Sequence, residues 1–228
     1  ILKNDTLQLL KGYGVKEIGK PGKIDENTLF AVASNTKSFT ATAMAMLVDE
    51  GKLSWDDKVV KFLPWFRLYD PYVSLNMTIR DLLSHRSGLQ TFSGDLIWYG
   101  STYSRDEIIE RASKLKPVYG FRTNYGYSNI MYLTAGQIIA KVSGMSWDEF
   151  IKERILIPLG MKNTNTSVTE LNLKGNTSIP HNDVNDSIIA IKYLNWDNIG
   201  PAGSINSSAS DMIKWLQFQL HKGKLESK

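Results

Sequence analysis

The segment from 34 to 50 constrains the fold most, because it contains the longest largely apolar run of the chain. Between Phe39 and Val48 there is no charged residue, and Ala and Met dominate. A helix that lacks a polar face is stable only when other elements cover it. The pattern therefore predicts a buried helix over 34–50, ended by Gly51. The run is about half the length that a membrane span requires, so it predicts a core helix and no membrane span.

Length and charge limit the class of protein. A chain of 228 residues is long enough for a substantial core in one or two domains. Its 42% hydrophobic and 22% charged residues are typical of a globular protein and argue against disorder. The net charge is +4, and the basic residues are scattered along the chain. Because nucleic-acid binding requires a clustered basic patch, we expect no nucleic-acid partner.

The rarity of metal-binding side chains excludes several kinds of site. The chain has no cysteine, which excludes disulfides, thiolate metal sites and a cysteine nucleophile. Its three histidines, His85, His181 and His221, have no metal-binding spacing, so we expect no metal and no cofactor. We expect His85 to form a local hydrogen bond in its own turn. A Ser-His-Asp triad on an α/β-hydrolase fold would require Gly-x-Ser-x-Gly, which is missing from the sequence.

Turn and cap residues divide the chain into elements. Alternation over 1–15 predicts a strand pair, and the apolar stretch 29–33 predicts a short strand before the buried helix. Ser-x-x-Glu sequences at Ser104 and Ser146 are capping boxes. The polar stretch 163–198 predicts loops with short strands. Further helices are expected over 56–63, from 78 to before 87, and over 104–115, 129–142, 146–157 and 208–220.

Ser34 and Lys37 are candidates for nucleophilic chemistry. A serine hydroxyl needs a base to remove its proton. Lys37 lies one helical turn after Ser34, so the two side chains share a face. The helix N-terminus and burial both disfavour a lysine cation, which makes a neutral amine a plausible general base. The alternative interpretation is a helix cap followed by a solvated lysine.

Tyr127 and Asn129 form a second cluster just before a predicted helix. A phenol can pass a proton between a nucleophile and a leaving group when nearby cations lower its pKa. Asn129 offers a donor and an acceptor that suit a substrate amide. The alternative is an aromatic core residue beside an ordinary helix cap. Trp65, Trp98 and Tyr99 either line a substrate cleft or belong to the core.

Taken together, these segments resemble the serine β-lactamase-like superfamily, in the branch that contains class C β-lactamases, penicillin-binding proteins and family VIII esterases. The resemblance runs through nearly the whole chain. It is carried by Phe30–Thr40, Ile79–Leu89, Tyr125–Asn129, Ile157–Thr164, Ala202–Ser204 and Ser208–Met212.

The resemblance implies a role for each candidate residue. Ser34 would be the acylated nucleophile, and Lys37, alone or with Tyr127, would activate it. Tyr127 would carry the proton to the leaving group, and Asn129 would bind the amide side chain of the substrate. The Ser34 N–H would form half of an oxyanion hole. The implied substrates are β-lactams, D-amino-acid peptides or small esters, and the implied location is periplasmic or extracellular.

The resemblance also implies an α+β fold, with an antiparallel sheet, flanking helices and a helical subdomain. We expect residues 1–70 to form an α/β part with the nucleophile helix and 71–204 a mainly helical subdomain. Residues 205–228 would return to the α/β part as a helix. Ser34 would lie in the cleft between the two parts.

One family motif, Lys-Thr-Gly or His-x-Gly on a strand, has no clear counterpart. The sequence His221-Lys222-Gly223 matches the His-x-Gly pattern, but it follows a predicted helix, and Gly223 is expected to be the C-cap of that helix. We therefore expect the C-terminal strands to be missing from this chain, or to be completed by a second chain or a further segment. The second functional hypothesis is a non-catalytic binding or scaffold protein that keeps the fold.

Overall fold

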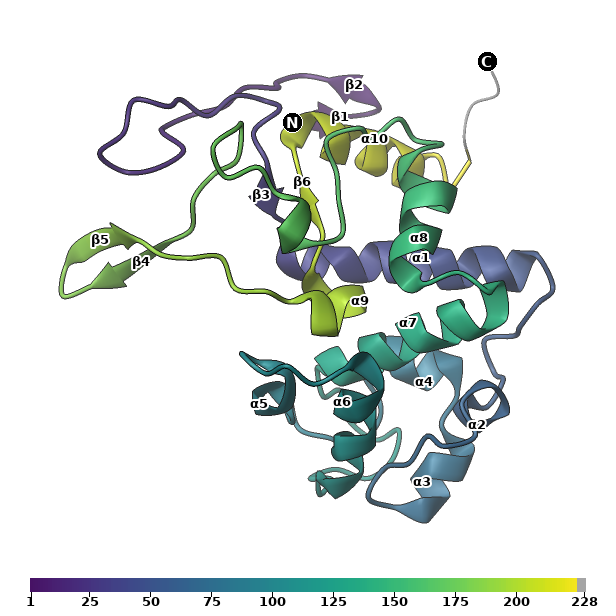
Figure 1. The fold of residues 1–228 in the computed structure, drawn as a ribbon. Helices are drawn as coiled ribbons and strands as arrows, with labels where there is room; N and C mark the ends of the chain where they lie inside the picture. The colour runs from purple at the N-terminus through teal and green to yellow at the C-terminus, as the bar shows by residue number, and fades with distance from the viewer. Residues whose placement is uncertain (225–228) are drawn as a thin grey trace.

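A long buried helix crosses the middle of the molecule (Figure 1). The computed structural model describes residues 1–224. Helix α1 (Thr36–Asp49) is the predicted core helix, and its side chains Phe39, Ala43, Met44 and Leu47 are fully buried. Helix α7 (Asn129–Ser143) packs along it and ends at Gly144, as predicted. These two helices form the framework that carries the candidate residues.

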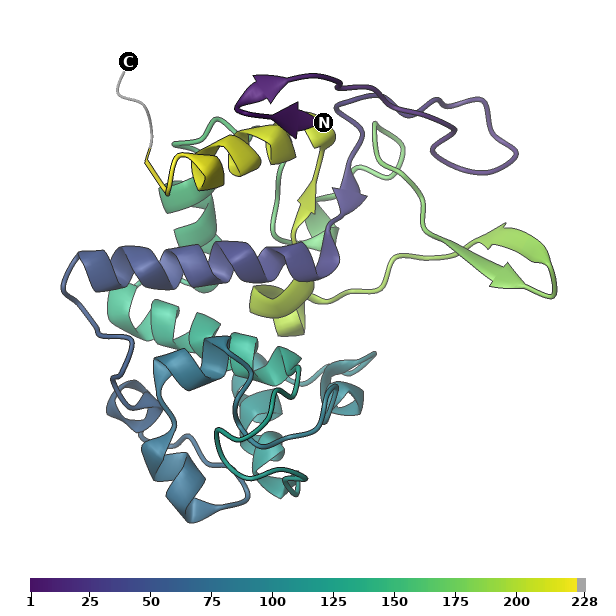
Figure 2. The ribbon, with the colours of Figure 1, turned by 180° about the vertical axis from the view of Figure 1, so that it is seen from behind.

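Short helices form the layer on the α7 side of α1 (Figures 1 and 2). The predicted caps Thr78 and Ser104 begin α4 and α6, each with a complete capping box. Two helices of this layer, α3 and α5, were not predicted; α3 begins at Pro71 after an Asp70 cap, and α5 follows Gly94. The layer comprises α2 (Val59–Phe62), α3 (Pro71–Asn76), α4 (Ile79–Leu83), α5 (Asp95–Trp98) and α6 (Arg105–Arg111), which a 3₁₀ turn (Ala112–Lys114) extends. The predicted helix over 56–63 is reduced to the single turn of α2.

Helices α8 and α10 lie on the opposite side of α1 (Figure 1). Ser146 caps α8 (Trp147–Ile151), and a π-helical turn (Lys152–Leu156) extends it. Ser208 caps α10 (Ala209–Leu220), as predicted. The indole of Trp215 on α10 stacks on Phe39 of α1, with ring centroids 3.8 Å apart. Helix α10 therefore completes the burial of α1.

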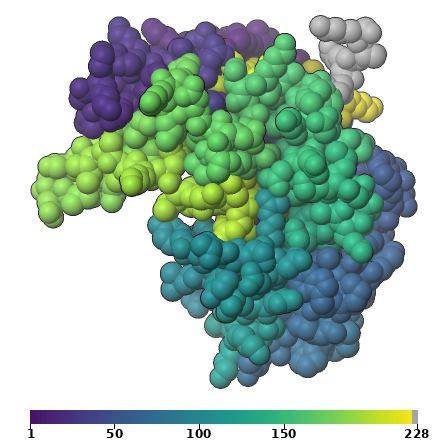
Figure 3. Space-filling model, in the orientation of Figure 1, coloured from purple at the N-terminus to yellow at the C-terminus, as the bar shows by residue number. Residues whose placement is uncertain are grey.

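The strands of the described residues form three separate antiparallel pairs. At the start of the chain β1 (Leu2–Lys3) pairs with β2 (Thr6–Leu7), within the predicted strand region. Strand β3 (Phe30–Ala31) pairs with β6 (Asn206–Ser207), which places the entrance of α1 beside the chain that precedes α10. A hairpin of β4 (His181–Val184) and β5 (Ser187–Ala190) projects from the body (Figures 1 and 3). The expected mixture of helices and strands is confirmed, with short strands in the stretch 163–198. Two 3₁₀ turns, Val168–Glu170 and Asp197–Ile199, flank this hairpin in sequence.

Helix α9 (Gly200–Gly203) approaches α7 closely at Gly136. A Cβ atom at Gly136 would lie 2.2 Å from Cγ of Pro201, a distance at which one of the two elements must move. The close contact brings the carbonyl groups of α9 next to α1. Among residues 1–224, no helix has the length and apolar character that crossing a membrane requires.

Candidate active site

The nucleophile candidate lies at the turn between β3 and α1. Ala33 has a φ of +45°, the left-handed region that side chains with a Cβ rarely adopt. The sharp turn starts a 3₁₀ turn (Ala33–Asn35), which leaves Ser34 exposed and continues into α1. Lys37 follows one turn later with only 7% of its surface exposed. The local fold therefore presents the hydroxyl to solvent and buries the amine behind it.

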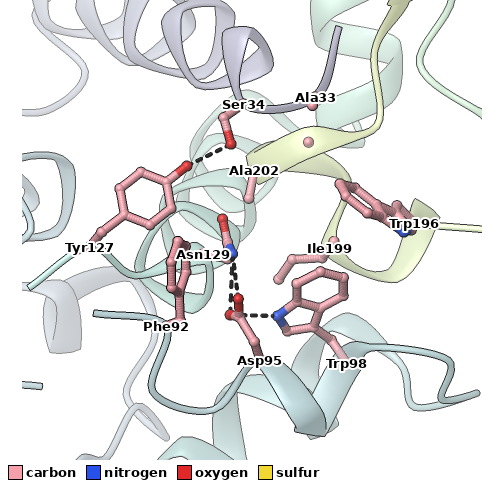
Figure 4. A pocket seen from close by; sticks show the side chains of 11 residues that line it. Ala33, Ser34, Phe92, Asp95, Trp98, Tyr127, Asn129, Trp196, Ile199 and Ala202 are labelled. Carbon is pink, nitrogen blue, oxygen red and sulfur yellow. Dashed lines mark hydrogen bonds between the residues drawn. The ribbon is translucent and has the colours of Figure 1, made fainter. Parts of the chain in front are cut away.

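The four predicted residues converge on one point (Figure 4 shows Ser34, Tyr127 and Asn129). The Ser34 Oγ lies 2.6 Å from the Tyr127 hydroxyl and 3.2 Å from Nζ of Lys37. Nζ of Lys37 also donates to Oδ1 of Asn129 at 2.7 Å. Tyr127 and Asn129 reach the site from the start of α7, whereas Ser34 and Lys37 come from the start of α1. The site therefore depends on the packing of these two helices.

Three oxygen atoms surround the amine of Lys37. Its Nζ donates to Oδ1 of Asn129 and, at 2.8 Å, to the carbonyl of Ala202 in α9. Burial lowers the pKa of Lys37 from 10.5 to about 8, and the charge of Asp95 opposes this effect. A neutral amine has two N–H donors and one lone pair. As an ammonium, Nζ donates to Ser34 Oγ as well; as a neutral amine, it can keep its two N–H groups on the other two acceptors, so that its lone pair faces the Ser34 hydroxyl.

Tyr127 differs from the expectation that cations lower its pKa. Burial raises the pKa of Tyr127 above 10, and the hydrogen bond from Ser34 only partly offsets this rise. Nζ of Lys37 lies over the face of the tyrosine ring, 4.7 Å from its centre. The phenol is therefore protonated at neutral pH, so Lys37 is the better placed of the two candidate bases.

Asp95 also belongs to the site, although its role was not predicted from the sequence. Both of its carboxylate oxygens accept from Nδ2 of Asn129 at 3.1 Å, and Oδ1 also accepts from Nε1 of Trp98 at 3.0 Å (Figure 4). The carboxylate fixes the amide of Asn129 with its oxygen toward Lys37. The available signal was the i,i+3 spacing of Asp95 and Trp98, which places both on one face of a short helix.

His85 corrects another expectation, because its ring bonds a residue distant in sequence. Its Nδ1 accepts from the Ser128 N–H at 3.0 Å, and its backbone carbonyl accepts from the Gly126 N–H at 2.9 Å. The ring stacks on Tyr127, with centroids 4.7 Å apart. Burial, with a smaller effect from the charge of Lys37, lowers the pKa of His85 to about 4. The histidine is therefore neutral and supports the Tyr127 loop.

The sequence His221-Lys222-Gly223 forms the end of α10, as expected from a C-cap glycine. His221 lies within 2.8 Å of a carboxylate oxygen of Asp5, and Gly223 has a φ of +76°. His221 faces a different cavity from the one beside Ser34. These residues do not contribute to the candidate site.

A pocket of about 300 Å³ opens beside Ser34. Its wall is aromatic and apolar apart from the site residues and Asp95 (Figure 4). The rings of Trp98 and Trp196 meet edge to face with centroids 5.5 Å apart. Of the three aromatic residues considered from the sequence, Trp98 lines this pocket. Within residues 1–224, no group of three or more His, Asp or Glu side chains is arranged to hold a metal ion.

The site groups an exposed serine with a buried lysine, a tyrosine and an asparagine. This set of side chains is the one expected of the serine β-lactamase-like superfamily. The beta-lactamase family model matches residues 1–228, and the chain belongs to that family. Similar proteins include Protein flp of Staphylococcus aureus strain MW2, which is 28% identical over 97% of this chain.

Two solved structures extend the comparison. The octameric penicillin-binding protein homologue from Pyrococcus abyssi is 27% identical, with a TM-score of 0.85 over 98% of this chain. The D-amino acid amidase from Ochrobactrum anthropi SV3, solved with L-phenylalanine amide, is 27% identical with a TM-score of 0.78 over 94% of the chain. The serine β-lactamase and peptidase-like fold is thereby confirmed. The chain spans 44% of the Staphylococcus relative and 52% and 61% of these two structures.

Proposed function

We propose that the protein is a serine hydrolase that works through an acyl-enzyme. The observation that carries this proposal is the position of Lys37, whose two N–H groups are held by Asn129 and Ala202 while Ser34 Oγ lies 3.2 Å from Nζ. A buried amine with a pKa of about 8 is a suitable base near neutral pH. The membership of the family and the amidase among the solved relatives support hydrolysis of an acyl bond.

The proposed reaction has two halves. Nζ of Lys37 takes the proton of Ser34 while Oγ bonds to the acyl carbon, and the carbonyl electron pair moves to the oxygen. The Ser34 N–H stabilises this oxyanion. When the bond to the leaving group breaks, Tyr127 donates its proton to that group and regains one from Lys37. In the second half, water bonds to the acyl carbon and loses a proton to Lys37; the bond from that carbon to Ser34 Oγ then breaks, Oγ regains the proton, and the carboxylic acid leaves.

The proposed substrates are those that the family resemblance implies: β-lactams, D-amino-acid peptides or small esters. The same proposal places the protein in the periplasm or outside the cell. We also propose that a further segment or a second chain supplies a second oxyanion donor. The greater length of the relatives supports this part of the proposal.

Intact-mass spectrometry with a fluorophosphonate and with a penicillin tests the proposal. We expect a stoichiometric adduct on Ser34 that is absent in Ser34→Ala. Ser187→Ala, which removes an exposed hydroxyl on the β4–β5 hairpin, is the control and should label like wild type. A penicillin adduct that persists would favour a peptidase, and one that decays would favour a β-lactamase. Absence of any adduct on the folded protein would favour the scaffold hypothesis.

A further inference from the structure

The pocket beside Ser34 contains one carboxylate in an otherwise neutral wall. Asp95 is the acidic residue among the side chains that line it, and it is partly exposed to the pocket. Its neighbours in the wall include Phe92, Trp98, Trp196 and Ile199. A carboxylate in such surroundings is stable when a cation or several hydrogen-bond donors compensate it.

Lys37 compensates Asp95 only while the amine is protonated. The other titratable groups packed around the pair are neutral near pH 7: burial lowers the pKa of His85 to about 4, raises that of Tyr132 to about 12, and raises that of Tyr127. The proposed base is the neutral form of Lys37. In that form Asp95 is left as the uncompensated charge of the described site, and its attraction for a proton on Lys37 opposes activation.

The carboxylate has capacity for a further donor. Oδ1 accepts from Asn129 and from Trp98, whereas Oδ2 accepts only from Asn129 among the described contacts. The two oxygens of a carboxylate provide about four acceptor positions. A donor on a ligand in the pocket can therefore reach Oδ2 without displacing the bond that orients Asn129.

We infer that Asp95 recognises a protonated amine on the acyl group, so that the acyl donors are esters or amides of amino acids with a free ammonium group. The ammonium takes over from Lys37 as the counter-ion of Asp95, which favours loss of the proton from Lys37 at the moment the substrate is bound. The aromatic wall formed by Trp98, Trp196 and Phe92 accommodates an apolar side chain of the same acyl group. This inference rests on the proposed function.

Two matched esters test the inference in the wild-type protein. Phenylalanine methyl ester, as each enantiomer, carries the ammonium, and methyl 3-phenylpropanoate lacks it with the rest of the acyl group unchanged. At pH 6.5 the amine is largely protonated. We expect kcat/KM for one enantiomer to exceed that for the neutral ester by about tenfold or more, the effect of a like charge that lowers the pKa of Lys37 by one unit.

Two variants separate recognition by Asp95 from its contact with Asn129. Asp95→Asn removes the charge, and we expect it to reduce the preference between the esters to about twofold or less, judged by kcat/KM. Trp98→Phe removes one hydrogen bond to Asp95 but keeps the charge, so the preference should persist.

Four outcomes would overturn the inference. Equal rates for the two esters in wild type would do so without any variant. An equal loss of both rates in Asp95→Asn would mean that Asp95 acts only by holding Asn129. Labelling of Ser34 by the fluorophosphonate without hydrolysis of either ester would reject the substrate class but leave the serine hydrolase proposal in place. Failure of the fluorophosphonate to label Ser34 would reject both.

Discussion

At the residue scale, the chemistry depends on the protonation of Lys37. Its pKa of about 8 means that most of the amine is charged at pH 7 and most is neutral at pH 9. Only the neutral form has a lone pair for the Ser34 proton. We therefore expect the rate of Ser34 labelling by a fluorophosphonate to rise with pH through an inflection near 8 and to level off at about pH 9.

Lys37→Arg is the companion variant for this prediction. A guanidinium stays charged throughout the accessible pH range and cannot act as the base. We expect labelling to slow by about a hundredfold or more and the inflection near pH 8 to disappear. A wild-type profile that stays flat from pH 6 to 9 would assign the base to another group.

The candidate residues differ in how far the sequence reveals them. Ser34 and Lys37 could be predicted because their chemistry depends on a local helical spacing. Asp95 and the carbonyl of Ala202 were not predicted, because they act on Lys37 from segments far from it in the chain. The hydrogen-bond partner of the His85 ring was mispredicted for the same reason, because that partner, Ser128, is 43 residues away in the sequence.

At the element scale, the close contact between α7 and α9 positions the carbonyl that holds Lys37. We expect Gly136→Ala to decrease the free energy of unfolding by about 1–3 kcal/mol, because the added methyl group overlaps Pro201. The sign of this change is informative, because in a helix interior alanine otherwise gives about 1 kcal/mol more stability than glycine. Chemical denaturation measures the free energy of unfolding of both proteins.

The control for Gly136→Ala is an exposed position of the same helix. Lys141→Ala shortens an exposed side chain of α7 that has no described hydrogen bond or ion pair and does not approach α9. It should leave labelling of Ser34 unchanged, whereas Gly136→Ala should slow it by displacing Ala202. If Gly136→Ala instead increases the free energy of unfolding, α9 moves to accommodate the methyl group with no net loss of stability.

Helix boundaries follow the same division between local and distant causes. Capping boxes at Ser104 and Ser146 form within four residues, so the sequence predicts them well. The single-turn helices α2 and α5 carry too little periodicity to be distinguished from turns, and packing against neighbours decides them. The predicted α2 was therefore too long, and α5 was missed.

At the scale of the whole molecule, the β4–β5 hairpin exposes apolar side chains away from the body. Ile188 is 58% exposed and Ile189 is 45% exposed, on a two-stranded ladder with free edges. Such edges pair with other chains. We expect Ile188→Lys to weaken self-association by roughly tenfold or more, the loss of one isoleucine burial, as measured by sedimentation velocity over a range of concentrations.

Ile157→Lys provides a matched control for the hairpin variant. Ile157 is 57% exposed but lies beyond α8, on another part of the surface. It should leave the association constant unchanged. If the two variants weaken association equally, general charge rather than the hairpin edge controls it. If neither does, the edge is not a contact in solution.

The arrangement that exposes Ser34 and encloses Lys37 has a consequence for chemical modification of the protein. Reductive methylation modifies lysines whose ammonium groups reach solvent, and the chain has many of these. Lys37 is enclosed by α1, α7 and α9 and has 7% of its surface exposed. It should be modified last, so its methylation, followed peptide by peptide, reports how often the three helices separate.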